Sequence, residues 1–208
     1  MDREYEKIIK YCEKCFEDNG DTNNGVGWPN HEDALKRYSV MLDIIPDKYS
    51  SASLLDLGCG LAHLYEYILN NKYNIKYNGV DMSEKFFSFC KNKFPEVNFM
   101  CLDILKDDIY AIPKVDFIVM NGLFTHKGSM EFTEMENYLH EMLIKTFSMA
   151  DKGIAFNVMS KIVDWEKDYL FHMPIDQLVK FIAKNLSRNF VIRHDYDTYD
   201  YTVYVYKK

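Results

Sequence analysis

The sequence predicts an α/β fold, in which a doubly wound, mostly parallel sheet of seven strands has an antiparallel last strand. From residue 53 onward, short apolar runs alternate with segments of helical periodicity, which is the pattern of parallel strands joined by crossover helices. The closing run TYDYTVYVYK alternates large aromatic or β-branched residues with other side chains. This alternation is typical of a half-covered antiparallel strand.

Ahead of that pattern lies a separate N-terminal segment. Residues 1–17 have the spacing of an amphipathic helix, and residues 18–28 (DNGDTNNGVGW) form a turn-rich break. A second helix follows, for which Asn30 is the expected N-cap and Pro46 marks the end. We therefore divide the chain into an N-terminal helical lid, residues 1–30, and one domain, residues 31–208.

The remaining elements follow in order along the domain. We expect the first five strands at residues 53–57, 77–81, 97–102, 115–120 and 153–158. Helices between them are expected at residues 62–70, 83–93 and 131–150. The last third adds a helix at residues 175–186 and two closing strands at 190–194 and 199–206.

Length, composition and charge narrow the class of protein. The 208 residues favour a single domain, and 48% hydrophobic residues indicate a folded globular protein. With 25 Lys and Arg against 32 Asp and Glu, the net charge of −7 argues against a nucleic-acid partner. The charged start lacks a signal peptide and no run of 18 apolar residues occurs, so we expect a cytoplasmic protein without a membrane partner.

The five cysteines are odd in number and are expected to be thiols. Cys12 and Cys15 form one Cys-x-x-Cys pair, but no second pair follows at zinc-ligand spacing. We therefore interpret this pair as structural or incidental.

A glycine turn joins the first strand to the next helix in the run LLDLGCGLA, residues 54–62. Gly58 and Gly60 lack a Cβ atom, which permits both the tight turn and a close approach of a ligand to the backbone. A nicotinamide or flavin fingerprint would need Gly-x-Gly-x-x-Gly, but position 63 is a histidine. The pattern therefore disfavours a dinucleotide cofactor.

Residues 56–62 resemble motif I of the class I S-adenosylmethionine-dependent methyltransferases, whose usual form is Asp/Glu-x-Gly-x-Gly-x-Gly. The match departs from that form only at Ala62. The resemblance extends over roughly residues 30–208. It implies the Rossmann-like methyltransferase fold, methyltransferase activity and S-adenosyl-L-methionine as the cofactor.

Acidic and polar residues end the strands that follow. Asp81 ends the second strand, where a carboxylate can accept both ribose hydroxyl protons. Asp103 follows the third strand at the family's usual place for contact with the adenine amino group, and Asn121 follows the fourth strand beside the methyl group. Arg37 matches the basic residue that often binds the cofactor carboxylate, although a surface salt bridge explains it equally well. The cofactor-binding residues that the resemblance implies are Asp56, Gly58, Gly60, Asp81, Met82, Asp103, Ile104, Asn121 and Arg37.

The candidate general bases are histidines, because an imidazole can accept a hydroxyl proton near pH 7. His126 lies just after the fourth strand and is the first candidate, followed by His172 and His31. The alternative is that alignment of the two reactants suffices without a base. The remaining histidines, His63, His140 and His194, are interpreted as structural. Aromatic residues in segments that family lids use are Trp28, Phe124, Trp165 and Tyr169.

The expected reaction is O-methylation of a small polar acceptor, such as a sugar or a phosphorylated intermediate of capsule or surface-polysaccharide biosynthesis. Short elements at residues 28–31, 121–125 and 153–160 resemble small bacterial methyltransferases encoded near such genes. N-methylation, DNA-base methylation and a catalytically silent binding module are the alternatives. No Asp, Asp, Asn set for magnesium follows the fourth strand, so we expect no metal. The oligomeric state stays open.

Overall fold

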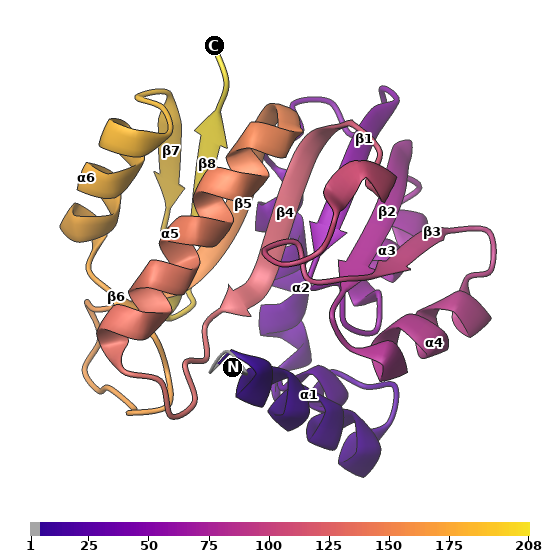
Figure 1. Cartoon of the computed structure of the whole chain (residues 1–208), viewed down its shortest axis with the longest axis horizontal. Helices are drawn as coiled ribbons and strands as arrows, with labels where there is room; N and C mark the ends of the chain where they lie inside the picture. The colour runs from indigo at the N-terminus through magenta and orange to yellow at the C-terminus, as the bar shows by residue number, and fades with distance from the viewer. Residues whose placement is uncertain (1–4) are drawn as a thin grey trace.

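The computed structural model describes residues 5–208, which form a twisted central sheet with helices on both faces (Figure 1). The α-helices are α1 (Glu6–Asn19), α2 (His31–Leu42), α3 (His63–Asn70), α4 (Glu84–Lys93), α5 (Phe132–Met149) and α6 (Ile175–Asn185). Two short 3₁₀ helices are η1 (Asn24–Val26) and η2 (Ile109–Ala111).

The seven main strands are β1 (Ala52–Leu57), β2 (Ile75–Asp81), β3 (Asn98–Cys101), β4 (Val115–Phe124), β5 (Ala150–Ser160), β7 (Phe190–Arg193) and β8 (Asp200–Tyr206). Their order is β3-β2-β1-β4-β5-β8-β7, and β8 runs antiparallel to both of its neighbours. The predicted fold class, a mostly parallel doubly wound sheet with an antiparallel last strand, is therefore confirmed.

Several boundaries differ from the prediction, and α2 ends at Leu42, ahead of the expected end at Pro46. A further two-residue strand, β6 (His172–Met173), pairs with the end of β5. The fourth strand continues four residues beyond its predicted end to Phe124, because its pairing with β5 is interrupted by an irregularity and then resumes. The strand β5 begins at Ala150, directly after α5, because the helix passes into the strand without a loop.

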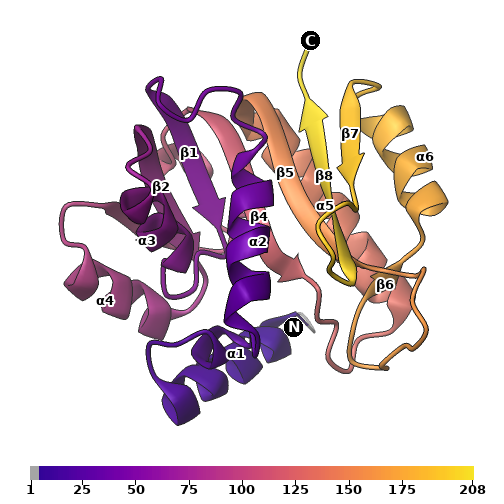
Figure 2. The same ribbon diagram turned by 180° about the vertical axis from the view of Figure 1, so that it is seen from behind.

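The central strands β1, β4 and β5 bury side chains on both faces, as expected for a sheet covered by helices on both sides. One core lies between the sheet and α5 and α6, with Leu55 and Ile118 on the sheet side. The other lies between the sheet and α2, α3 and α4, with Leu54 and Phe117 on the sheet side. Figure 2 shows α2 across this second face.

The segment before the domain packs along the edge of the sheet where the parallel strands end (Figures 1 and 2). Helix α1 lies across that edge, and the expected cap at Asn30 is present, since its side chain accepts hydrogen bonds from the first-turn amides of α2. Residues 1–4 of the predicted first helix lie outside the described residues. Helix α1 continues two residues beyond its predicted end, to Asn19.

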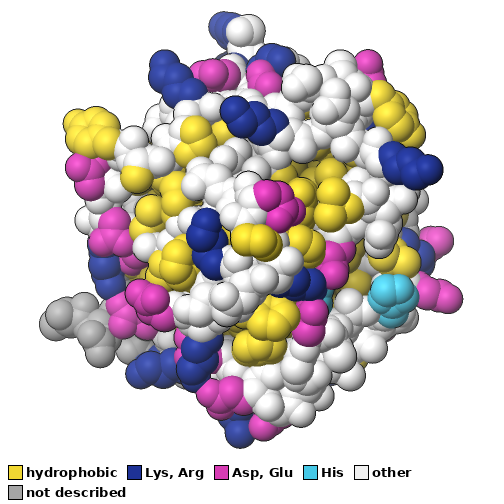
Figure 3. All heavy atoms as spheres, turned by 90° about the vertical axis from the view of Figure 1, so that its right-hand side faces the viewer, with side chains coloured by type: hydrophobic (Ala, Val, Ile, Leu, Met, Phe, Trp, Pro, Cys, Tyr) yellow, Lys and Arg dark blue, Asp and Glu magenta, His cyan; other side chains and the backbone are white. Residues whose placement is uncertain are grey.

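Surface charges of both signs are interspersed with apolar side chains on the face over β3 and α4 (Figure 3). Within residues 5–208, no helix combines the length and the apolar character needed to cross a bilayer.

Candidate functional site

The glycine turn after β1 is tied to the end of β2. Gly58 and Gly60 both adopt left-handed backbone angles, with φ of 77° and 52°. The amides of Gly58 and Cys59 donate to the carbonyl of Val80 at 2.8 and 3.1 Å. Ala62, the departure from the family motif, has φ of 60°, a conformation that glycine adopts without steric cost. The left-handed backbone conformation at position 62 therefore explains why the family motif usually has glycine there.

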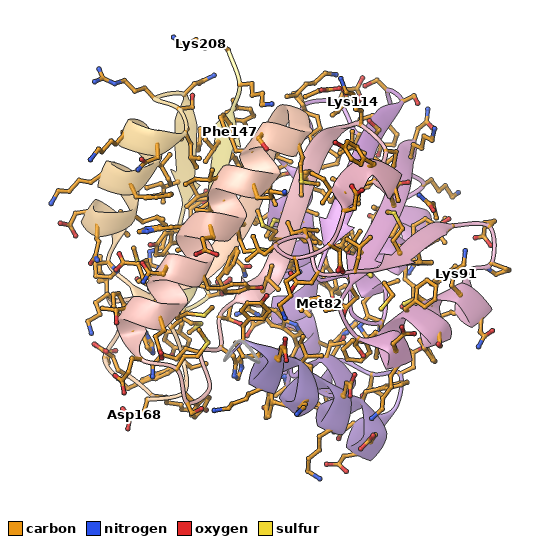
Figure 4. The ribbon with its side chains drawn as sticks, in the orientation of Figure 1. Met82, Lys91, Lys114, Phe147, Asp168 and Lys208 are labelled. Atoms are coloured by element: carbon orange, nitrogen blue, oxygen red, sulfur yellow. The ribbon has the colours of Figure 1, made fainter. Side chains whose placement is uncertain are left out.

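Asp81 joins the glycine turn to the start of the next helix. Its Oδ2 accepts the amide of Gly60 and its Oδ1 accepts the amide of Ser83, each at 2.9 Å. Burial raises the pKa of the Asp81 carboxyl, while these amide hydrogen bonds oppose that shift. The neighbouring Met82 lies between the sheet edge and α1 (Figure 4). The carboxylate is thus held at the strand end by two backbone donors.

Asp56 is almost fully buried at the end of β1. The hydroxyl of Tyr77 donates a hydrogen bond of 2.7 Å to its Oδ2. Burial raises the pKa of Asp56 to about 7; the Tyr77 hydrogen bond opposes that shift and the charge of Asp81 adds to it. Asp56 is therefore a carboxyl that titrates near neutral pH.

Asp103 connects the loop after β3 to the N-terminal segment. Its Oδ2 accepts a hydrogen bond of 2.5 Å from the Tyr5 hydroxyl, and its Oδ1 accepts the amide of Leu105 at 2.9 Å. The Tyr5 ring stacks on Tyr138 of α5 with ring centroids 4.5 Å apart. The segment that covers the sheet edge therefore contacts the predicted adenine-binding carboxylate directly.

The end of β4 leaves the regular sheet at residues 121–123. Met120 pairs with Phe156 and Phe124 pairs with Val158, so β4 holds two more residues than β5 between these pairs. Gly122 lies in this bulge with φ of 82°, and its amide donates to Oδ1 of Asn157 at 2.7 Å. Oδ1 of Asn121 is buried and has no hydrogen-bond partner among the described residues.

These strand ends line one cavity, which encloses about 1180 Å³ of space that is partly open to solvent. Of the predicted cofactor residues, eight line it: Asp56, Gly58, Gly60, Asp81, Met82, Asp103, Ile104 and Asn121. The N-terminal segment covers the cavity with Tyr5, Ile8, Ile9 and Cys12. Burial raises the pKa of the Cys12 thiol to about 12, so this thiol stays protonated near neutral pH.

Arg37 does not line the cavity. Its Nε and Nη2 donate to Oδ1 of Asp200 at 2.9 and 2.7 Å, and its guanidinium lies 4.3 Å from the centre of the Trp28 ring. The side chains of this ion pair are 12% and 0% exposed, so the pair is buried and not a surface salt bridge. Its predicted contact with the cofactor stays a prediction.

None of the three candidate bases lines the cavity. The His126 ring stacks between Tyr11 and Tyr169, with centroids 5.4 and 5.6 Å away, and burial lowers its pKa. His172 is buried, with Nδ1 2.7 Å from the carbonyl oxygen of Ser160. His31 is exposed at the start of α2, with Nδ1 2.6 Å from Nδ2 of Asn23. The structure thus places none of these three histidines in the cavity lining, and their catalytic role stays a prediction.

Several residues that line the cavity were not predicted as site residues from the sequence. His63, interpreted as structural, lines the cavity, and its Nε2 lies 2.9 Å from Oδ1 of Asp21. Its place as the first helical residue after the glycine turn was the available signal. Of the four predicted lid aromatics, only Trp28 lines the cavity; Phe124 is fully buried in the core instead.

Metal-ligand clusters are absent from the part of the chain that the structure describes: no three His, Cys, Asp or Glu side chains gather as a metal ion would require. The five cysteines are free thiols.

Comparison with known proteins identifies similar sequences. A family model described as a methyltransferase domain matches residues 55–143. Rv1506c of Mycobacterium tuberculosis, classed by its name among the methyltransferases with no acceptor given, is 24% identical over 160 residues, or 74% of this chain and 93% of that protein. The malonyl-(acyl-carrier protein) O-methyltransferase of Acetivibrio thermocellus is 27% identical over 92 residues, 43% of this chain and 32% of that enzyme.

Solved structures share the fold over the whole chain. Magnesium protoporphyrin IX methyltransferase from Synechocystis PCC 6803, crystallised with bound S-adenosylmethionine, superposes with a TM-score of 0.67 at 16% identity, covering 100% of this chain and 98% of that one. Geranyl diphosphate C-methyltransferase from Streptomyces coelicolor superposes with a TM-score of 0.63 at 11% identity, covering 99% and 98%.

Proposed function

The chain is a class I S-adenosylmethionine-dependent methyltransferase, and we propose that it methylates a hydroxyl oxygen of a small polar acceptor. A sugar or a phosphorylated intermediate of surface-polysaccharide biosynthesis is the acceptor class that we favour. The observation that carries this proposal is the convergence of three strand-end carboxylates on one covered cavity.

The cavity residues suggest how the cofactor would lie. Asp81 has both oxygens fixed by backbone amides, and each oxygen keeps a further lone pair for a ribose hydroxyl. Asp103, beyond it along the sheet edge, would accept the adenine amino group. The buried, unpartnered Oδ1 of Asn121 would accept a proton of the cofactor's ammonium group, which satisfies an otherwise costly buried acceptor.

This orientation follows the topology of the sheet. Ligands of open parallel sheets lie where the strand order reverses, which here is between β1 and β4. The adenosine half would then lie over β1, β2 and β3, and the methyl group would lie near the bulge of β4. The cofactor supplies an electrophilic methyl group, and the protein aligns it with the acceptor and excludes water.

A small acceptor fits the cover over the cavity. The segment that carries Tyr5, Ile8 and Ile9 lies across the opening, which leaves little access for a macromolecular chain such as duplex DNA. Transfer to oxygen is favoured because one relative is named as an O-methyltransferase. A C-methyltransferase among the structural neighbours shows that the fold also serves other acceptor atoms.

We place the general-base role with His126. It follows the end of β4 by two residues, and burial lowers its pKa, which keeps the imidazole neutral and able to accept a proton near pH 7. Its ring currently stacks between two tyrosines, one of which, Tyr11, belongs to α1. Movement of α1 when ligands bind would free one face of this ring.

The test is methyl transfer from tritium-labelled S-adenosylmethionine to a panel of simple glycosides, sugar phosphates, phenols and amines. We expect the largest incorporation of the labelled methyl group with a hydroxyl compound. The Asp81→Ala variant serves as the negative control. Transfer only to amines, or only to macromolecules, would contradict the proposed acceptor class.

A further inference from the structure

We propose that Trp28 positions the methyl acceptor and that a closed ring of contacts holds its indole against the end of β4. The members of the ring are Trp28, Arg37, Asp200, Asn157 and Gly122. This inference rests on the proposed function, because the methyl group must lie beside β4 for Trp28 to face the acceptor.

The first half of the ring is a buried ion pair between two elements that are far apart in the sequence. Arg37 of α2 uses Nε and Nη2 to hold Oδ1 of Asp200, the first residue of β8. The carboxylate of Asp200 has no exposed surface, so hydrogen bonds from Arg37 and Asn157 replace those of water. The guanidinium is fixed in orientation because two of its nitrogens donate to the same oxygen.

The second half carries that orientation to the end of β4. Oδ2 of Asp200 accepts Nδ2 of Asn157 at 2.7 Å. Oδ1 of Asn157, which has no solvent exposure, accepts the amide of Gly122 at 2.7 Å. Gly122 lies in the bulge, where the β4–β5 pairing is interrupted, so the Asn157 side chain provides an acceptor for its amide. The carboxamide thus holds the backbone of the bulge at Gly122.

Trp28 closes the ring. A Cβ atom on Gly122 would lie 2.5 Å from Cζ2 of Trp28, so the indole edge touches the backbone of the bulge. The Arg37 guanidinium lies over the indole face at 4.3 Å, a cation–π distance. The indole is therefore fixed on one edge by Gly122 and on one face by Arg37.

The place of Trp28 indicates what this arrangement does. Trp28 and Gly122 both line the cavity, at the β4 side, whereas the carboxylates proposed for adenosine lie at the ends of β2 and β3. Because Trp28 touches Gly122 in the bulge, beside the proposed place of the methyl group, its indole belongs to the acceptor side of the cavity in this proposal. Alignment of the acceptor with the methyl group requires a rigid wall, because small displacements from the reactive geometry lower the rate strongly.

This assignment makes Arg37 a positioning residue. Its two hydrogen-bonded nitrogens are committed to Asp200, and it does not line the cavity. The ring therefore predicts that loss of Arg37 affects the acceptor and leaves cofactor affinity nearly unchanged. A contact between Arg37 and the cofactor carboxylate predicts the reverse.

The experiment uses the fluorescence of Trp28. The chain has two tryptophans, so a Trp165→Phe background leaves Trp28 as the single emitter. In this background, the double variant Arg37→Gln/Asp200→Asn removes both charges together, which avoids leaving a buried carboxylate unpaired. The matched control is Arg193→Gln, which breaks a different arginine–aspartate contact, to Asp195 and Asp43.

The readouts are acrylamide quenching of Trp28, binding of S-adenosylhomocysteine by calorimetry, and methyl transfer to the best acceptor of the panel. For the double variant, we expect at least threefold stronger quenching, cofactor-product affinity within threefold of the parent, and kcat/KM for the acceptor reduced at least tenfold. Trp28→Leu should reduce kcat/KM similarly, with cofactor-product affinity retained. The Arg193→Gln control should match the parent in all three readouts.

Unchanged quenching in the double variant would overturn the ring. A tenfold loss of S-adenosylhomocysteine affinity in the double variant, with kcat/KM for the acceptor unchanged, would also overturn it. That result would assign Arg37 to the cofactor. Failure of the parent protein to bind S-adenosylhomocysteine would contradict the proposed function and not the ring, since the quenching measurement needs no ligand.

Discussion

The Tyr5 hydroxyl donates a hydrogen bond to Oδ2 of Asp103 across 98 positions of the sequence. Asp103 is also the carboxylate proposed to bind the adenine amino group. In the structure, the N-terminal segment therefore contacts the same oxygen-bearing group that the cofactor would use. Cofactor binding should displace or rearrange the Tyr5 contact.

Substitution of Tyr5 by Phe removes this competing donor and keeps the ring that stacks on Tyr138. We expect S-adenosylhomocysteine to bind about threefold to tenfold more tightly, since one hydrogen bond contributes about 0.5–1.5 kcal/mol. Calorimetric titration of the Tyr5→Phe variant measures this directly. Weaker binding would instead mean that the Tyr5 hydroxyl itself contacts the cofactor.

The contribution of Asp56 to the free energy of unfolding should decrease as the pH rises. Its pKa is raised to about 7, so between pH 4 and 7 the native carboxyl keeps a proton that the unfolded chain releases. The stabilisation that Asp56 contributes to the folded state is therefore fully present at low pH and is lost as the pH rises through about 7. Between pH 5 and pH 8, the free energy of unfolding of Asp56→Asn should therefore rise by about 2 to 3 kcal/mol relative to that of the parent protein.

Urea unfolding at the two pH values tests this expectation. Asp116→Asn is the control with the opposite sign: hydrogen bonds from Lys152 and Ser53 lower the pKa of Asp116, so its contribution is already complete at pH 5. The effect of Asp116→Asn should be the same at both pH values. An Asp56→Asn effect that is equally independent of pH would show that Asp56 does not titrate in this range.

Removal of the His126 imidazole tests its proposed role as a base. His126→Asn should lower turnover by about 10²- to 10⁴-fold, the usual effect of losing a general base. Tyr11→Leu breaks the ring stack and retains the imidazole, so it separates a structural effect from a chemical one. Turnover of His126→Asn within a few fold of the parent, with an unshifted acidic limb, would transfer the role to His172 or His31.

The turn-rich break after α1 should respond to ligands. Oδ2 of Asp21 accepts Nζ of Lys93 at 2.7 Å, and Oδ1 lies 2.9 Å from Nε2 of His63, so one aspartate ties this break to α3 and α4. Hydrogen exchange at residues 18–28 should slow when S-adenosylhomocysteine binds, and should be faster in Asp21→Asn. Strong protection without any ligand would mean that residues 1–30 are scaffold and not a lid.

Local sequence patterns were sufficient to predict many residues of the part of the cavity proposed for the cofactor. Asp56, Asp81 and Asp103 each end or follow a strand of a parallel sheet, and such ends meet at one edge. The acidic positions and the glycine turn therefore lie together once the strand order is known. Motif I, which carries Asp56 and the glycine turn, is contiguous in the sequence, whereas Asp81 and Asp103 were identified by their places at later strand ends.

The part of the cavity proposed for the acceptor depends on contacts between residues far apart in the sequence, which no local pattern encodes. Arg37 and Asp200 are 163 positions apart, and Arg37 alone fits a cofactor ligand or a surface salt bridge equally well. The bulge at Gly122 arises from the pairing of β4 with β5, and periodicity within β4 does not reveal it. Tyr5 was missed because its role depends on where the first helix docks.

The measurement that tests the central claim most directly is calorimetric binding of S-adenosylhomocysteine to the parent protein and to Asp81→Ala. Charge-assisted hydrogen bonds contribute about 1.5–3 kcal/mol each, so loss of the Asp81 carboxylate should weaken binding at least tenfold. Asp116→Ala, near the opposite end of β4 from the bulge, should leave affinity unchanged. No binding by the parent protein, or equal affinity in Asp81→Ala, would contradict the proposed cofactor site.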